Sequence, residues 1–204
     1  MSNKDVRAPY LTYEKIRPIA AEFLDEYNPE SEIPVPIEHI IEYCFKINII
    51  PANSIRFLYG IDGWISNDLK SIYVDYQIYS SDNNYRYLFT IAHEIGHVVL
   101  HGDIFRSLSF SRVEEWVDIV NSIDSNQYGY LEFHAYCFAG LILVPESTLK
   151  KEYVEAVSKV ESLGFDTTTV IFGDYVSNHL QKRFDVSSQT IAKRLKYDGL
   201  VNDI

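Results

Sequence analysis

Positive charge is scarce in this sequence of 204 residues. Lysine and arginine together number 18 against 29 aspartates and glutamates, which leaves a net charge of −11 at pH 7 with histidine neutral. Such an acidic surface argues against nonspecific binding to nucleic acid or to anionic membranes, although it leaves room for a local basic patch. We therefore expect no general affinity for polyanions.

Cysteine and long apolar runs are also scarce. The two cysteines, Cys44 and Cys137, both lie in apolar periodic segments, so we expect reduced core thiols rather than a disulfide. The longest apolar stretch, FAGLILVP at 138–145, is far shorter than the ~20 residues that a membrane-spanning helix needs. The N-terminal segment is polar and has no apolar core, so we expect no secretory signal. We therefore expect a cytoplasmic protein that does not interact with membranes.

Internal repeats are absent, and most of the sequence follows helical patterns with one extended region in the first half. In that region, β-branched and aromatic residues with turn signals predict three short strands, at 47–51, 55–66 and 70–76. Apolar residues at helical spacing predict the other elements. These predicted helices cover 13–27, a segment that starts at Pro36, 81–102, 112–121, 131–145, 146–160, 168–183 and 187–199. The expected class is α+β, mostly helical with a small three-stranded antiparallel sheet.

The segment RYLFTIAHEIGHVVLHG carries His93, His97 and His101 at four-residue steps, with Glu94 directly after the first, and thus contains an HExxH motif. On a helix, residues i and i+4 point the same way, so His93 and His97 converge on one Zn²⁺ ion. Glu94 lies one step around the helix, where it can take a proton from zinc-bound water as general base without being a ligand. Two such buried histidines would be costly without a metal, so we interpret the segment as a zinc site rather than as core packing.

A catalytic zinc needs a third protein ligand and an open fourth position. The best candidate segment is YLEFHAYCFAGLILVP, in which Glu132 shares a helical face with two alanines that permit close approach to the HExxH helix. We therefore predict Glu132 as the third ligand, with His134, on another face, as its rival. His101 lies one turn beyond His97, too far along the axis for the same ion, and we assign it to a role behind the ligands or to packing.

These residues also carry a family resemblance. The sequence resembles the ImmA/IrrE family of bacterial and phage zinc metallopeptidases, in which a helix of the form RFTxAHELGHxxLH follows a strand and a later helix reads ExxAxxFAxxLLMP. The counterparts here are YLFTIAHEIGHVVLH and EFHAYCFAGLILVP, preceded by IPVPIEHIIEYCFKINIIP and KSIYVDY. The match covers about residues 13–146 and, more weakly, 165–200.

The resemblance implies a zincin-like fold in which His93 and His97 bind zinc, Glu94 is the catalytic acid and base, and Glu132 is the third ligand. The position of His134 is usually Glu or Gln in such motifs, which is a departure from the family pattern. Family members typically cleave or control a helix-turn-helix repressor in mobile elements, phages and stress responses, and many are encoded beside it.

The C-terminal segment LQKRFDVSSQTIAKRLKYDGLV predicts two helices around a short turn, with Ser187 capping the second, which is a helix-turn-helix pattern. Residues 178–199 hold five Lys or Arg against two Asp. We favour a helical packing or protein-binding module over a DNA contact, because the acidic remainder of the chain repels DNA over a Debye length of about 10 Å. The expected domains are a metallopeptidase domain at 1–160 and a C-terminal helical region at 161–204 packed on it.

We therefore expect a zinc-dependent endopeptidase that hydrolyses a peptide bond in a regulatory protein, with a helix-turn-helix repressor encoded nearby as its partner. The alternative is a zinc-containing DNA- or repressor-binding regulator without proteolytic activity. A cysteine hydrolase using Cys137 and His134 is a weaker alternative, since no oxyanion-binding elements are visible. The sequence leaves the transition-state donor open among Tyr128, Tyr130, Tyr136 and His134.

Overall fold

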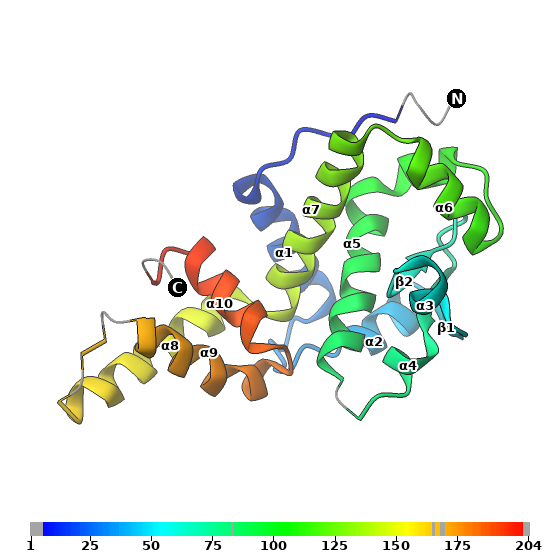
Figure 1. Ribbon diagram of the computed structural model, residues 1–204. Coiled ribbons are helices and arrows are strands. Elements are labelled where there is room, and N and C mark those ends of the chain that lie inside the picture. The colour runs from blue at the N-terminus through cyan, green and yellow to red at the C-terminus, as the bar shows by residue number, and fades with distance from the viewer. Residues whose placement is uncertain (1–5, 83, 165, 168–169, 202–204) are drawn as a thin grey trace.

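The computed structural model describes residues 6–82, 84–164, 166–167 and 170–201 and shows a largely helical molecule with one small sheet at one side (Figure 1). The predicted α+β class, mostly helical, is confirmed. The elements of the described residues, in chain order, are α1 (Tyr13–Tyr27), α2 (Ile37–His39), the π-helical turn η2 (Ile40–Cys44), β1 (Asn48–Ala52), α3 (Ile55–Tyr59), β2 (Gly63–Ile65), β3 (Ser71–Asp75), α4 (Tyr76–Tyr79), α5 (Tyr85–Ser107), α6 (Val113–Ser122), α7 (Ser125–Leu143), α8 (Glu146–Ser162), α9 (Val170–Phe184) and α10 (Ser188–Tyr197).

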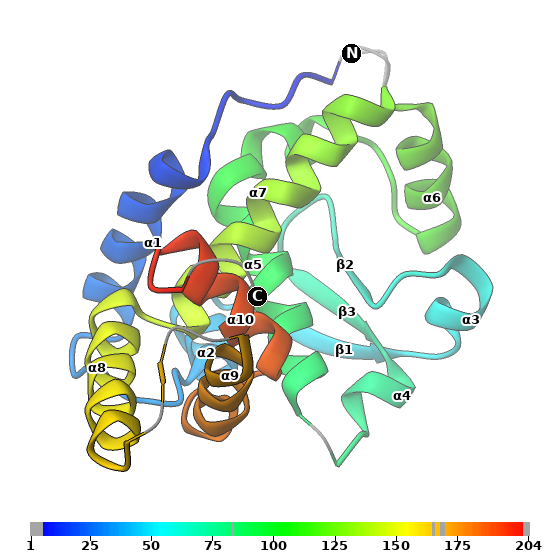
Figure 2. The same cartoon turned by 60° about the vertical axis from the view of Figure 1, so that its left-hand side comes forward.

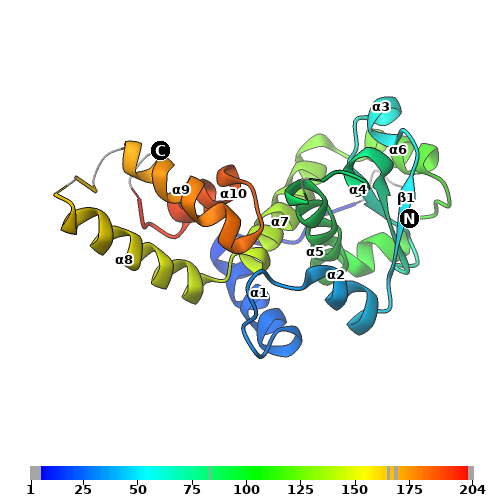
Figure 3. The ribbon, with the colours of Figure 1, turned by 90° about the horizontal axis from the view of Figure 1, so that it is seen from below.

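Helices α5 and α7 lie side by side through the middle of the molecule (Figures 1 and 2). The sheet packs against α5 through β2 and β3, and α1 packs against α7. Seen from below, α8, α9 and α10 gather at one end and the sheet lies at the other (Figure 3). The α5–α7 pair therefore forms the centre on which both ends are built.

The sheet is mixed, and the prediction of an antiparallel sheet is wrong. Its strand order is β1-β3-β2, in which β1 pairs with β3 in parallel and β2 pairs with β3 in antiparallel fashion. A parallel pair needs a crossover connection, and the chain between β1 and β3 supplies one through α3 and β2. The third strand in sequence, β3, therefore lies in the centre of the sheet, between β1 and β2.

The segment predicted as one long strand at 55–66 divides into a helix and a short strand. Residues 55–59 form α3, whose second backbone amide, that of Arg56, donates to the buried carboxylate of Asp75 at 3.0 Å. Gly60 ends α3 in the left-handed conformation with φ of 73°, which favours glycine. The apolar side chains that suggested a strand, Phe57 and Leu58, are exposed instead of packed on the sheet.

The close approach of α5 and α7 depends on small residues. A Cβ atom at Gly96 of α5 would lie only 3.1 Å from the Cα of Ala135 and 3.2 Å from its carbonyl oxygen on α7. Ala135 and Ala139, on the face that carries Glu132, are fully buried.

Helix α5 also continues past the predicted stop at Gly102 to Ser107, and Gly102 is buried beneath the Leu69 side chain.

Arg194 fastens the C-terminal helices to the core. Its guanidinium donates to the Tyr13 hydroxyl (3.1 Å) and to the backbone carbonyls of Gly140 (2.8 Å) and Val144, and it forms an ion pair with Asp198 at 2.7 Å. The two carbonyls lie at the C-terminal end of α7, where the Gly140 carbonyl also accepts from the Val144 amide and the Val144 carbonyl is among the last four of the helix, which have no intrahelical donor. The predicted α9–α10 pair therefore uses one of its basic side chains for internal packing.

The remaining expectations have mixed outcomes. Ser187 caps α10, accepting from the Thr190 amide, as predicted. Cys137 is buried, but Cys44 is exposed, so its expected place in the core is wrong. The predicted start of a helix at 168 lies outside the described residues, and the domain boundary after residue 160 stays a prediction.

None of the helices within the described part of the chain is both long enough and apolar enough to cross a membrane.

Replacing Gly96 with valine should lower the free energy of unfolding by about 1–3 kcal/mol, because the new side chain overpacks the α5–α7 contact. Chemical denaturation measures the change. Gly129→Val is the matched control, since a Cβ at Gly129 of α7 meets nothing within 4 Å, and we expect it to stay within about 0.5 kcal/mol of the wild type. Equal effects of the two substitutions would contradict a tight contact at Gly96.

Candidate metal centre

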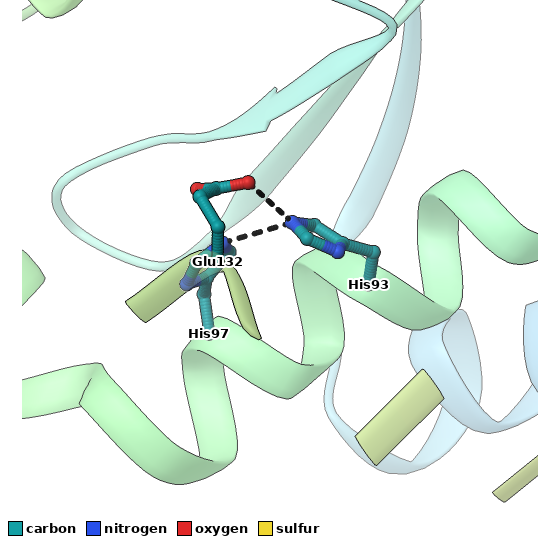
Figure 4. Close-up of side chains that lie close together, drawn as sticks. All are labelled: His93, His97 and Glu132. Carbon is teal, nitrogen blue, oxygen red and sulfur yellow. Dashed lines mark hydrogen bonds and ion pairs between the residues drawn. The ribbon is translucent and has the colours of Figure 1, made fainter. Parts of the chain in front are cut away.

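Three side chains from the two central helices converge on one point (Figure 4). His93 and His97 come from successive turns of α5, and Glu132 comes from α7. The Nε2 atom of His93 lies 3.1 Å from Nε2 of His97 and 3.2 Å from Oε2 of Glu132, and Nε2 of His97 lies 3.4 Å from Oε1 of Glu132. Within the described ranges, these three residues form a group of ligand atoms close enough together to hold a metal ion.

The spacing of these atoms fits a small tetrahedral ion. Bonds of about 2.0–2.1 Å, the values typical of zinc with imidazole or carboxylate ligands, place neighbouring ligand atoms of a tetrahedron about 3.3 Å apart. The two Nε2 atoms are 3.1 Å apart, and the Glu132 carboxylate approaches both of them, with Oε2 at 3.2 Å from His93 and Oε1 at 3.4 Å from His97. One ligand atom from each residue lies within 4.8 Å of the other two. Two imidazole lone pairs and a carboxylate facing one another repel unless a cation or protons lie between them. The donor set therefore fits a divalent metal.

The charges of the cluster favour an anionic glutamate beside the two imidazoles. Burial alone would raise the pKa of Glu132, but its hydrogen bonds with His93 and His97 outweigh burial and hold the pKa well below its usual range. Burial lowers the pKa of His97, whereas the contact with Glu132 overcomes burial at His93 and raises its pKa. Glu132 is therefore ionised at neutral pH, which is the form that binds a metal.

Glu94 lies beside the cluster but outside the three-residue group. It is 6% exposed, and the backbone amide of Ile65 in β2 donates to its carboxylate. Burial raises the pKa of Glu94 to about 7, with the neighbouring Glu132 carboxylate acting in the same direction and His93 acting against it. A carboxyl with a pKa near neutrality exchanges protons readily, as a general base and acid must.

The other two predicted candidates lie behind the cluster. His101 Nδ1 is 3.1 Å from Nδ1 of His97, and His101 Nε2 is 3.2 Å from Nδ1 of His134. Burial lowers the pKa of His101 to about 2 and also lowers that of His134, so both rings are neutral. The structure thus brings Glu132 to the two HExxH histidines and places its rival, His134, against His101 instead.

A cleft of about 890 Å³ opens over the cluster. Its lining comes from the segment before and within β2, from α5 and α7, and from the start of α10. Tyr85, Phe89 and Tyr136 form an aromatic part of the wall, and Ser187 and Gln189 bring the C-terminal region to the same cleft. The cluster is therefore accessible to a large ligand.

Two contributors to the site were not predicted from the sequence. Ile65 supplies a backbone amide to Glu94, which no side-chain pattern reveals. Gly63 lets β2 approach α5, since a Cβ there would lie 2.7 Å from Cγ2 of Thr90 and 2.8 Å from the carbonyl of Tyr73. A glycine inside a strand is a signal for such close approach.

Comparison with known proteins gives one informative match. The family model Peptidase_M78, described as IrrE N-terminal-like domain, matches residues 71–196. This range runs from β3 to α10 and contains His93, His97, Glu132, Glu94 and the C-terminal helices. No curated protein matches the sequence significantly.

Proposed function

Because the chain belongs to the Peptidase_M78 family of metallopeptidases, we propose that it is a zinc-dependent endopeptidase that hydrolyses a peptide bond in a regulatory protein. The observation that carries this proposal is the joint presence of a three-ligand cluster and a separate buried carboxylate, Glu94, in one open cleft. A site that only holds a metal for structural reasons is usually closed by four protein ligands and needs no such carboxylate.

His93, His97 and Glu132 would hold the zinc ion. Two imidazoles and one carboxylate form a donor set that catalytic zinc uses, with the fourth position left for water or substrate. When bound, zinc supplies a water of lowered pKa and polarises the scissile carbonyl.

Glu94 is the proposed general base and acid. It accepts a proton from the attacking water and then delivers that proton to the amine of the leaving peptide. The amide of Ile65 fixes the carboxylate at the edge of the sheet, and a pKa of about 7 suits both halves of this transfer. The hydrogen bond to β2 therefore orients the base as well as satisfying its buried oxygen.

Tyr128 is the proposed donor to the oxygen of the scissile carbonyl. It lines the cleft one helical turn before Glu132, and its hydroxyl lies within hydrogen-bonding reach of that carboxylate. Burial, supported by Glu132, raises the pKa of Tyr128, so the hydroxyl keeps its proton and stays a donor. Tyr130 is exposed, and the hydroxyl of Tyr136 lies against Lys193 at 2.8 Å, whereas the hydroxyl of Tyr128 faces the Glu132 carboxylate of the cluster.

The substrate that we propose is a helix-turn-helix repressor encoded nearby, as the family resemblance implies. The cleft supports a polypeptide substrate, because its aromatic wall suits apolar side chains and its volume exceeds what a single amino acid fills. The contribution of Ser187 and Gln189 means that the C-terminal region takes part in substrate binding in this account.

The described residues give less support to the alternatives. For a DNA-binding regulator, Arg194 is buried in the protein, Lys193 donates to Tyr136, and Arg183 pairs with Glu152. For a cysteine hydrolase, burial raises the pKa of the Cys137 thiol to about 12, so it stays protonated and unreactive at neutral pH.

Glu94→Gln should keep stoichiometric zinc and lose about 10²–10⁴-fold in kcat/KM, because the amide cannot accept the proton of water. The assay is cleavage of the helix-turn-helix protein encoded by the neighbouring reading frame, followed by mass spectrometry, with zinc measured by elemental analysis. Glu22→Gln, at an exposed position of α1, is the control and should change neither quantity. Loss of zinc from Glu94→Gln, or retained cleavage, would contradict the role of Glu94.

Tyr128→Phe should lower kcat by about 10²–10³-fold with zinc affinity and KM little changed, because it removes a donor to the developing oxyanion. Tyr136→Phe is the matched control from the same helix and the same cleft, and its kcat should stay near the wild-type value because that hydroxyl lies against Lys193 of α10 rather than beside Glu132. Equal losses in the two variants would point to packing rather than to catalysis.

A further inference from the structure

A row of histidines continues from His97 of the cluster into the core, and its two inner members, His101 and His134, have no part in the chemistry proposed above. His97, His101 and His134, here called the histidine relay, are each at most 3% exposed. Nδ1 of His97 meets Nδ1 of His101 at 3.1 Å, and Nε2 of His101 meets Nδ1 of His134 at 3.2 Å. Three imidazoles in an apolar core are costly unless their polar atoms satisfy one another.

The direction of the relay follows from its inner end. His134 donates to the backbone carbonyl of Leu11, which can only accept. Since Nδ1 of His134 faces His101, its Nε2 is the nitrogen left to carry this proton. A neutral imidazole has one N–H and one lone pair, so Nδ1 of His134 accepts from Nε2–H of His101.

The same rule fixes the next two nitrogens. Once Nε2 of His101 carries its proton, Nδ1 of His101 has a lone pair and accepts from Nδ1–H of His97. Nε2 of His97 is then unprotonated, and this is the atom that faces His93 and Glu132 in the cluster. The relay thus ends on the lone pair that a metal ion needs.

We propose that His101 and His134 are positioning residues that lock His97 in the Nδ1–H tautomer and so present its Nε2 to the metal. This inference deepens the proposed zinc site and rests on it. Metal-binding histidines commonly donate their second nitrogen to a carboxylate, a carbonyl or water. Here the final acceptor is the carbonyl of Leu11, and hydrogen bonds through the rings of His134 and His101 connect it to His97.

Phenylalanine and glutamine at position 101 separate this role from packing. Phenylalanine fills the space without polar atoms, whereas the glutamine amide can accept from His97 and donate to His134. We expect His101→Phe to weaken zinc binding by about 10–100-fold and His101→Gln to bind within about threefold of the wild type. Competition with a chromophoric chelator measures the affinity, and His179→Phe, on the exposed side of α9, is the control without effect.

Nitrogen-15 NMR of the metal-free protein reads the tautomer directly and needs neither zinc nor substrate. In the wild type we expect a protonated Nδ1 and an unprotonated Nε2 at His97, and in His101→Phe a mixture of tautomers. An Nε2–H tautomer in the wild type, or wild-type zinc affinity in a folded His101→Phe, would overturn the relay. If His101→Phe does not fold, the wild-type spectrum and the zinc affinity of His101→Gln still test the proposal. Absence of peptidase activity would count against the proposed function and leave this result unchanged.

Discussion

The distance between α5 and α7 is the constraint on which the rest of the structure depends. Gly96 sits directly before His97 and meets the backbone of Ala135, which lies one turn after Glu132. This contact brings a carboxylate from one helix to 3.2–3.4 Å from two imidazoles of the other. Metal bonds tolerate deviations of only about 0.2 Å, so helices held apart by one extra methyl group would not form the same cluster.

The polar groups of the centre lie in an apolar interior, where hydrogen bonds with one another and with the backbone stabilise them. On one side, the amide of Ile65 binds Glu94, so the short strand β2 is tied to the proposed base as well as to β3. On the other side, His101 and His134 connect His97 to the backbone of Leu11. The sheet, the two central helices and the segment before α1 thus each contribute to the orientation of one site.

Local sequence patterns predicted the parts of this site that lie on single helices. The four-residue step from His93 to His97 and the offset of Glu94 follow from helical periodicity alone, and the alanine face of α7 pointed to Glu132. The pairing of β1 with β3, the use of 55–59 as a helix and the contact between His101 and His134 depend on segments distant in sequence. No local pattern encodes them, and the apolar residues of α3 even favoured the wrong element.

Zinc-edge X-ray absorption of the zinc-loaded protein tests the proposed metal centre, because it counts the light-atom ligands and shows how many of them are imidazoles. We expect two imidazole nitrogens and one carboxylate oxygen from the protein at about 2.0–2.2 Å, with the carboxylate contribution lost in Glu132→Gln. A third imidazole at the metal, or a spectrum that Glu132→Gln leaves unchanged, would contradict the centre formed by His93, His97 and Glu132.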